Sequence, residues 1–565
     1  MKRQFIQSET EEQLDGGKDL MENFTTRYDN GLEESLNIGK IISEGNLTNF
    51  EIKRLERMRE AWNFYEGYHW EDIPSNDTAQ VTYNYCRTFV NKFVSFELGA
   101  GFTIETTPGN TKTITVNDPI IKKGIDVDGN GFIEGEEQNT VLTEQTEEDY
   151  LNTVWNYNKR DDFCVELGQT KSITGEAWVK VQYQSPEELD DPFEEYPNGK
   201  IKISCIPTQY VFPKFDDHDR DKLVSLLIMY PIRVEKNTGI LRNRISETTV
   251  MYKEFWTKDE IKVYQGDKEL DTFENPYGLI PFVQIKNFII AGRSYGAGDL
   301  DDLIPLNIEY NTKKSDVSEV IDYHSAPITL VYGAKIGNLE KGANKVWGGL
   351  PKDSKVENLG LNGDLIASNT YTNALKTSMC EVGAIPETVL GGASAISNTS
   401  GVALQYMNAP LIDRTKVKRQ CTKTGLELIN KMILYISLAE GLIEKPESVP
   451  MKDFLKTEVN LPDTLPKDDL IELQKIQQEL LLGLECRHGA MKRLGKDDID
   501  NKLAEIDKER EEHPELFNSM LQTAWYQNNF NSGVNSGMTN GSTAVEQVRQ
   551  EVTGQNGGEN TGVAE

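Results

Sequence analysis

The stretch from Asp299 to Ala439 constrains the fold more than any other part of the chain. Apolar residues recur at three- and four-residue spacing over 299–324 and again over 371–382, which predicts two helices. Glycines and strand-like runs such as Ile328–Tyr332 fill the sequence between them. The middle of the first helix, Glu309–Asp316, is almost wholly polar. We therefore expect this helix to pack beside copies of itself rather than inside a single-chain core.

Pro305 and Pro410 interrupt the helical patterns of this stretch. A proline has no N–H and its ring strikes the preceding turn, so the first helix either kinks at Pro305 or begins near Ile304. A later pattern resumes at Ser400, and Pro410 is expected to kink it. The small-residue segment Gly391–Gly401 has almost nothing to bury, and a connection of this length calls for a functional reason.

Composition limits the class of protein. A chain of 565 residues with 37% hydrophobic and 27% charged residues suits roughly two to four domains of a soluble protein. Its apolar runs fall far short of the ~20 residues that cross a bilayer. The first residues lack the apolar segment of a secretory signal. Six scattered cysteines favour free thiols in a reducing compartment over a disulfide framework or a zinc site.

The formal net charge of −31 also excludes a function class. Proteins bind DNA through clustered lysines and arginines, so a chain this acidic is not a conventional DNA-binding protein. The same charge suits either plain solubility or a conduit that repels phosphate and lets DNA pass without sticking.

Residues 126–137 match the calcium-binding loop of an EF-hand at each diagnostic position. Gly131 stands where the loop turns sharply and a Cβ would obstruct the backbone. Oxygen ligands at this spacing favour Ca²⁺ over Mg²⁺ as the cofactor. The alternative is an acidic turn that is well solvated and binds no metal. The ligands would come from Asp126, Asp128, Asn130, the carbonyl of Phe132, Glu134 and Glu137.

The flanks of this loop differ from those of a paired EF-hand. Pro119 lies in the short segment before it, Gly135 interrupts the segment after it, and the sequence contains no second loop. We therefore expect a lone loop with a structural role, inserted into a larger domain.

The residues before Asp299 predict an α+β domain over 46–298, preceded by a polar arm at 1–45 that we expect to be mobile. Helical spacing marks Asn46–Gly67, Tyr83–Leu98 and Glu147–Leu167. Alternating apolar and polar residues then predict strands, and polar turns between them suggest an antiparallel meander. The predicted strands are Ala177–Tyr183, Lys200–Ile206, Tyr210–Phe215, Val224–Ile232, Thr248–Phe255, Glu260–Tyr264 and Pro281–Ile285.

Helices also dominate the C-terminal part of the sequence. A strongly apolar pattern over Leu426–Leu442 predicts a core helix, and leucine spacing predicts helices at Asp468–Leu484 and Asp498–Glu511. From 527 to 565 the chain is rich in Asn, Gly, Ser and Gln, and we expect disorder.

No catalytic signature accompanies these elements. The glycine-rich run that begins at Gly337 lacks the Lys-Ser/Thr of a P-loop, and the sequence has neither a Gly-x-Ser-x-Gly elbow nor a His-Glu-x-x-His motif. The five histidines have no metal-ligand spacing, and with 91 acidic residues any carboxylate pair is uninformative. We therefore do not expect an enzyme.

In order and spacing these elements resemble the portal proteins of tailed bacteriophages, in the family typified by the portal of a Bacillus siphophage. The resemblance covers roughly residues 50–515 and is carried by segment patterns, not by a catalytic motif. The calcium-type loop is an addition to the pattern. The segments that carry the resemblance are Asn91–Gly101, Leu279–Asn287, Asp299–Asn311 with Ser315–Asp316, and Leu465–Asp469.

The resemblance implies an α+β, portal-type subunit that forms rings. Its parts would be an α+β wing, a two-helix stem, a small clip that contains β structure, a kinked helix with a tunnel loop, and an α-helical crown. The implied ranges are 46–298 for the wing, 299–324 and 370–383 for the stem helices, 325–369 for the clip, 384–445 for the tunnel loop and the kinked helix that returns to the wing, and 446–526 for the crown.

The same resemblance implies a homododecameric channel at one capsid vertex of the virion, assembled in the host cytoplasm, for packaging and ejection of double-stranded DNA. The terminase large subunit and then a head–tail adaptor would dock on it. Major capsid and scaffolding proteins would be further partners, and no membrane would be involved. The tunnel loop that faces DNA would include Gly391, Gly392, Ser394, Ser397, Asn398, Thr399 and Ser400.

Two sets of basic residues are candidate contact sites. In the clip, lysines outnumber acidic residues and either dock an acidic partner or are simply solvated: Lys335, Lys341, Lys345, Lys352 and Lys355. The second set either touches DNA phosphates or pairs with acidic groups of a neighbouring subunit, and the acidity of the chain favours the second. This set, the basic cluster, comprises Arg414, Lys416, Lys418, Arg419 and Lys423.

Two other classes of function are alternatives to the portal. A calcium-dependent binding or adhesion module built on residues 126–137 predicts a signal peptide or paired loops. An enzyme predicts a clustered nucleophile and base. The sequence contains none of these features.

Overall fold

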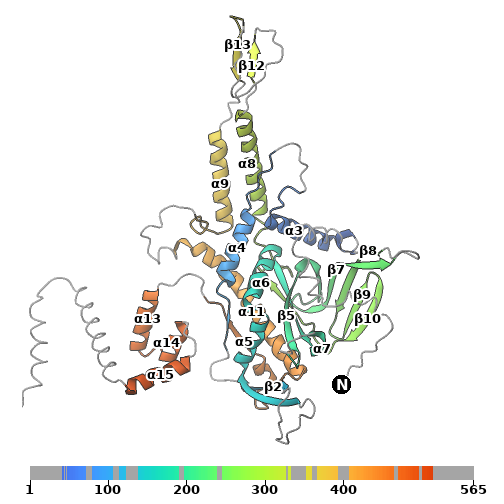
Figure 1. Ribbon diagram of the computed structural model, residues 1–565, viewed down its shortest axis with the longest axis vertical. Coiled ribbons are helices and arrows are strands. Elements are labelled where there is room, and N and C mark those ends of the chain that lie inside the picture. The colour runs from blue at the N-terminus through green and yellow to red at the C-terminus, as the bar shows by residue number, and fades with distance from the viewer. Residues whose placement is uncertain are drawn as a thin grey trace, which may run out of the picture. The chain divides into compact units, whose positions relative to one another are not determined.

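The computed structural model divides the chain into two compact units, Met1–Leu465 and Pro466–Glu565 (Figure 1). Most of the predicted N-terminal segment at 1–45 and all of the predicted tail at 527–565 lie outside the residues that the structure describes. Within the described part of the chain, no helix is both long and apolar enough to span a membrane. The described residues are 38, 41–43, 45, 47–71, 79–105, 113–121, 138–189, 196–237, 245–325, 329–332, 351–358, 365–391, 406–462, 469–494 and 499–512.

The body of the first unit contains two main antiparallel sheets. The larger is a meander in the order β10-β9-β8-β7-β6, formed by Lys268–Glu274, Glu260–Gln265, Ile245–Trp256, Leu223–Asn237 and Val211–Phe215. The other has the order β11-β4-β5, formed by Phe282–Lys286, Glu176–Gln184 and Lys200–Ile206. Two smaller sheets also belong to this unit. In one, β1 (Thr103–Glu105) pairs with β15 (Glu458–Asn460). The other has the strand order β14-β2-β3, formed by Ile443–Glu444, Thr113–Ile121 and Gln138–Thr146.

Helices pack against the β11-β4-β5 sheet and against one another: α3 (Asn49–Glu66), α4 (Tyr85–Leu98), α5 (Glu147–Tyr157), α6 (Arg160–Thr174) and α11 (Ala409–Ala439). The main core lies between α11 and this sheet, where Leu426, Ile429 and Ile433 share a buried cluster with Val179. α11 passes so close to β11 that a Cβ added at Gly425 would lie 2.5 Å from the Ile285 side chain. Short elements complete the unit: α7 (Pro186–Leu189), η1 (Thr208–Tyr210) and α12 (Met451–Phe454).

The structure departs from the predicted body in three places. The helix predicted over Glu147–Leu167 is two helices, because Lys159 has a left-handed backbone conformation (φ 53°) between α5 and α6. β10 could not be predicted by alternation, because all seven of its residues are exposed. Ile38 and Ile41, which the sequence analysis placed in a mobile N-terminal segment, are fully buried in the core beside the meander.

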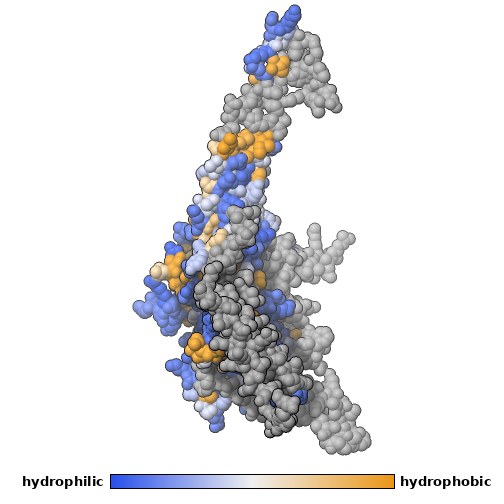
Figure 2. Space-filling view, turned by 90° about the vertical axis from the view of Figure 1, so that its left-hand side faces the viewer, coloured by the Kyte–Doolittle hydropathy of each residue, from blue (hydrophilic) through white to orange (hydrophobic). Residues whose placement is uncertain are grey.

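Two helices, α8 (Ile304–Ser325) and α9 (Leu365–Val382), lie side by side and project from the body (Figure 1). We call this pair the arm. Beyond it, β12 (Thr329–Tyr332) pairs with β13 (Lys355–Asn358). Figure 2 shows apolar surface near the far end of the arm, where the side chains of Ile321 and Ile366 are 50% and 78% exposed.

Both prolines stand in first turns of helices. α8 begins at Ile304, which confirms one of the two alternatives for Pro305. α11 begins at Ala409, one residue before Pro410, and a turn at Asn408 separates it from the helical residues Tyr406 and Met407, so the helical pattern is interrupted beside Pro410. A first-turn N–H has no partner within its helix, and a proline there loses no hydrogen bond.

One face of the polar middle of α8 is bound by its own chain. A strap, Ala79–Tyr85, which is extended up to the start of α4, runs along the helix, and Asn307 donates a hydrogen bond to the Tyr83 carbonyl (3.1 Å). Asn311 and Ser315 of the polar stretch thus have partners within the subunit, and packing of α8 beside copies of itself stays a prediction. Alternate N–H groups of the strap donate to a column of α8 side chains at four-residue spacing: Ala79 to Glu319 (3.1 Å), Val81 to Ser315 (2.9 Å), Tyr83 to Asn311 (3.0 Å) and Tyr85 to Asn307 (3.2 Å).

His69, which follows α3, binds one member of the same column, Asn311. Its Nε2–H donates to the Phe64 carbonyl at 3.0 Å, and its Nδ1 accepts from the Asn311 amide nitrogen at 2.6 Å. Because the Asn311 oxygen accepts the Tyr83 N–H, the amide cannot turn round. The bonds therefore require neutral His69, and a proton on Nδ1 would set donor against donor.

The calcium-type loop at 126–137 lies outside the described residues. The segments that flank it are strands, whereas an EF-hand loop lies between helices. β2 and β3 pair in register up to Ile121 opposite Gln138, with Pro119 opposite Thr140.

The second unit contains α13 (Asp469–Leu481), α14 (Arg487–Arg493) and α15 (Ile499–Glu512). Arg493 joins α14 to α13 through ion pairs with Glu472 (2.6 Å) and Glu479. Leucines on α13 and directly after it are exposed: Leu473, Leu480, Leu481, Leu482 and Leu484.

The strap predicts a pH dependence of stability. Burial lowers the pKa of His69 from 6.5, although its bond to Phe64 opposes the shift. As pH falls, the unfolded chain takes up this proton first, so the free energy of unfolding is highest above the ordinary pKa and falls below it. His69→Gln can make both hydrogen bonds without titrating. In urea titrations at about pH 7 and about pH 5.5 it should lose less stability than wild type; equal losses would contradict the assignment.

Candidate functional site: a buried charge cluster at the foot of the arm

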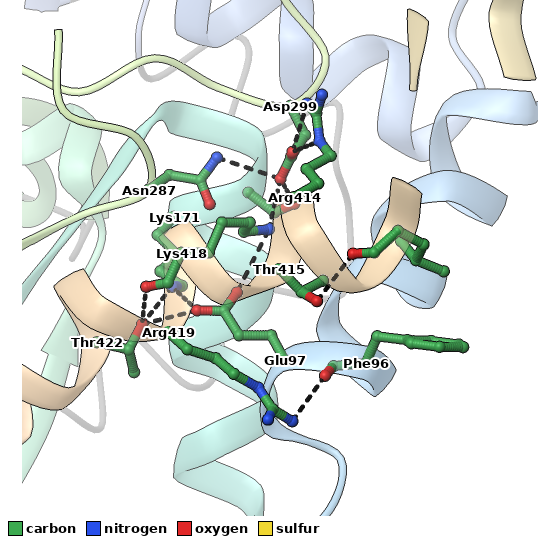
Figure 3. Close-up of polar contacts among 12 residues, drawn as sticks. Phe96, Glu97, Lys171, Asn287, Asp299, Arg414, Thr415, Lys418, Arg419 and Thr422 are labelled. Atoms are coloured by element: carbon green, nitrogen blue, oxygen red, sulfur yellow. Dashed lines mark hydrogen bonds and ion pairs between the residues drawn. The ribbon is translucent and has the colours of Figure 1, made fainter. Parts of the chain in front are cut away.

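Five ionisable side chains meet where α4, α6, α11 and the segment that leads into α8 come together (Figure 3). We call this set the charge cluster. It comprises Glu97 on α4, Lys171 on α6, Asp299 at the foot of the arm, and Arg414 and Lys418 on α11. The side chains of Glu97, Lys171, Asp299 and Lys418 are fully buried, and that of Arg414 is 22% exposed.

Asp299 collects donors from three parts of the body. Its Oδ1 accepts from Arg414 Nη2 (2.9 Å) and Nε (3.2 Å), and its Oδ2 accepts from Lys418 Nζ at 2.7 Å. Ser172 and Asn287 also donate to Oδ2. Burial alone would raise the pKa of this carboxyl, but Lys418 and Arg414 outweigh it and hold the pKa at about 2. Asp299 is therefore ionised throughout the physiological range.

Glu97 is the second acceptor of the cluster. It pairs with Lys171, accepts from the Thr422 hydroxyl at 2.7 Å, and lies 3.3 Å from Lys418 Nζ. Burial opposes ionisation, yet the lysines lower the pKa of Glu97. Burial lowers the pKa of Lys171, and its contact with Glu97 opposes the shift. Two buried carboxylates thus share three basic side chains.

Helical spacing and one glycine bring these groups together. Arg414, Lys418 and Thr422 follow at four-residue steps on α11, so they form one stripe that faces both carboxylates. α4 and α6 approach closely at Gly168, where an added Cβ would lie 2.9 Å from Val94. The stripe was visible in the sequence as a basic cluster, but its acidic partners lie 115 to 325 residues away along the chain.

The structure pairs the basic cluster within its own subunit. Arg414 and Lys418 belong to the charge cluster, and Arg419 donates to the carbonyls of Phe96 (2.9 Å) and Pro462 (3.0 Å). Lys423 lies 3.2 Å from Glu458 and 3.8 Å from Glu427, while Lys416 is exposed. For these four residues the contacts correct the expectation that DNA or acidic groups of a neighbouring subunit bind the set; for Lys416 that expectation stays a prediction.

Most of the other predicted site residues lie outside the described part of the chain. Gly391 is exposed with φ 86°, and the rest of the predicted tunnel loop is not described. In the predicted clip, Lys352 and Lys355 are exposed, Lys355 pairs with Glu357, and Lys335, Lys341 and Lys345 are not described. No metal-binding group of His, Cys, Asp or Glu occurs among the residues that are described, and the ligands predicted at 126–137 are outside them.

Comparison with known proteins decides the family. A family model described as phage portal protein, SPP1 Gp6-like, matches residues 45–515. The chain belongs to this phage portal family. The resemblance seen in the sequence is therefore confirmed over nearly the same residues, and so is the mixed α+β fold. The family is one of structural proteins and places this portal protein in the virion, at the portal vertex.

Among solved structures, this portal protein is similar to a chain from the virion of a native gene transfer agent particle. The two share 12% identity over 60% of this chain and 80% of the other, with a TM-score of 0.31. A similarity at this level carries no argument about mechanism. No curated protein matches.

The charge cluster predicts very different effects for two neighbouring lysines. Lys418→Met should destabilise the protein by about 3–5 kcal/mol, because Glu97 and Asp299 stay buried with fewer cations. Lys416→Met is the matched control on the exposed side of α11 and should change stability by less than about 0.5 kcal/mol. Urea unfolding followed by circular dichroism measures both. Similar small effects of the two substitutions would show that the cluster adds little to the stability of the body.

Proposed function

We propose that this portal protein assembles with copies of itself into a twelve-fold ring around a channel that passes double-stranded DNA during packaging and ejection. The observation that carries the proposal is the arm, which projects from the body and ends in the β12–β13 pair, within a chain that belongs to the portal family (Figure 1). Identical subunits close into a ring when each contacts the next through a heterologous interface. Exposed Ile321 and Ile366 on the arm, and the exposed leucines after α13, supply apolar surface for such contacts.

The parts of the subunit take different roles in this proposal. The arm would be the stem, the β12–β13 pair would belong to the clip, and the segment that begins at Gly391 would be the tunnel loop. The body would form the wing, with α11 returning to it, and the second unit would supply the crown. The channel wall would then come from the stem helices and the tunnel loop.

Charge supports passage of DNA without tight binding. Around a twelve-fold ring, the net charge of −31 on each chain sums to roughly several hundred negative charges, a field that repels phosphate. Four of the five basic-cluster residues make contacts inside the subunit, which removes them as a DNA-binding surface. The role would be mechanical and electrostatic, without a covalent step.

We propose that the clip docks the terminase large subunit during packaging and a head–tail adaptor afterwards, while major capsid and scaffolding proteins surround the wing. The exposed side chains of Lys352 and Lys355 suit an acidic partner surface, although Lys355 already pairs with Glu357. Docking would then be electrostatic and sensitive to salt.

Negative-stain electron microscopy of the purified full chain tests the assembly. We expect rings with a central hole, and we expect Ile366→Asp to reduce their number because it places a charge on an exposed apolar site of the arm. Asn373→Asp, at an exposed polar site on the same helix, is the control and should leave the rings intact. Compact single subunits under all conditions for wild type would contradict the proposed function.

We further propose that residues 126–137 bind Ca²⁺ at the end of the β2–β3 hairpin. The match at the ligand positions supports this, and so does the register of β2 and β3, which brings the two ends of the segment together at Ile121 and Gln138. A structural role follows, since the loop would brace one hairpin rather than open a helix pair. An adhesion module has no support beyond this loop.

Isothermal titration calorimetry with CaCl₂ tests the metal site. We expect wild type to take up one Ca²⁺ per chain at this loop, and Asp126→Ala and Glu137→Ala to lose it, because each removes a carboxylate ligand. Glu144→Ala, in the neighbouring strand, is the control. Equal uptake in all four proteins would remove the loop from the account.

A further inference from the structure

We propose that Arg414 is a positioning residue that sets the angle of the arm on the body, and that its contacts open while the rest of the charge cluster stays closed. The proposed ring and channel concern how subunits assemble. This inference concerns a movement within one subunit and stands without them.

Arg414 connects α11 to the two segments at the near end of the arm. Its Nη2 and Nε donate to Asp299, five residues before α8 begins, at 2.9 and 3.2 Å. Its Nη1 donates to the carbonyl of Val382, the last residue of α9, at 3.4 Å. The last carbonyls of a helix have no partner within it and form its negative end, so a cation there is favourable. One guanidinium therefore contacts both the segment that leads into α8 and the end of α9.

Two aromatic rings from the body fix the plane of this guanidinium. The Arg414 carbon Cζ lies 5.0 Å from the centroid of Phe93 on α4 and 4.9 Å from that of Phe288, which follows β11. A planar guanidinium can stack on rings and donate several hydrogen bonds from its edge at the same time. Rotation of the arm would pull Asp299 and Val382 away from this plane.

Arg414 differs from the other cations of the cluster in its exposure. Its side chain is 22% exposed, whereas those of Lys418 and Lys171 are fully buried. Water can replace hydrogen bonds at the exposed edge, while Lys418 continues to neutralise Asp299 at 2.7 Å. Release of Arg414 therefore leaves no carboxylate buried without a cation.

The backbone beside this contact is under strain. Ala384, two residues after α9, has a left-handed conformation (φ 53°) that favours glycine. Hydrogen bonds from Ala384 to Glu381 and from Ile385 to Cys380 hold the turn (3.1 and 2.9 Å). A strained residue persists only where its surroundings enforce it. We therefore place the pivot of α9 at this turn, once the hydrogen bond from Arg414 to Val382 has broken.

Pulsed electron paramagnetic resonance measures the angle directly. Nitroxide labels would be placed at Thr370 on α9 and Asp162 on α6, both exposed, after exposed Cys486 and half-buried Cys421 are replaced by serine. Labelled chain is diluted with unlabelled chain, so that distances within one subunit are read whether or not rings form. The series is wild type, Arg414→Met, Arg414→Lys and the control Lys416→Met.

We expect one narrow distance distribution for wild type and for Lys416→Met, and a shifted or broadened distribution for Arg414→Met. Arg414→Lys should partly recover the wild-type distribution, because it keeps a cation beside the Asp299 carboxylate. Circular dichroism confirms that each variant is folded, and Arg414→Gln replaces Arg414→Met if that variant does not fold. A lowered Tm with an unchanged distance distribution would mean that Arg414 only stabilises the fold, and would overturn the proposal.

Discussion

The buried carboxylate of Asp299 is the contact on which the arrangement of the first unit depends. An ionised carboxylate without partners would be too costly to bury, and this one is tolerated because Lys418, Arg414, Ser172 and Asn287 all bind it. Those partners come from α11, α6 and the end of β11, so the carboxylate is satisfied only when these elements and the foot of the arm are all in place. Apolar packing could be met by several arrangements, whereas this set of donors fits one.

The arm shows how polar residues can serve packing within one chain. α8 is poor in apolar residues through its middle, and the strap supplies backbone N–H groups to a column of its side chains instead. A column of side chains at four-residue spacing offers one acceptor for every second backbone N–H of an extended segment. The arm is therefore supported by polar contacts on one flank and joined to the body by charged contacts at its foot. Its apolar surface at the far end is left for other contacts.

Much of this fold is predictable from periodicity, and the charge cluster is not. Apolar spacing located both helices of the arm, and alternation located strands such as Lys200–Ile206, because both patterns reflect one buried face of a local element. The partners of Lys418 could not be found in this way, since Glu97 and Asp299 lie far from it along the chain and carboxylates are abundant. The strap could not be predicted for the same reason: the polar column of α8 is regular, but no neighbouring residue in the sequence shows which segment it binds. The burial of Ile38 and Ile41 could not be predicted, because two apolar residues form too short a pattern to distinguish from a polar N-terminal segment.

A double-mutant cycle between Asp299→Asn and Lys418→Met tests the central claim, that a buried ion pair fixes the foot of the arm to α11. Urea unfolding of wild type, both single variants and the double variant gives the coupling free energy. The account predicts a coupling near the upper end of the usual range, about 3 kcal/mol, because each single substitution leaves the other charge buried. Additive effects, with a coupling near zero, would contradict it and would leave apolar packing, the strap and Arg414 to hold the arm.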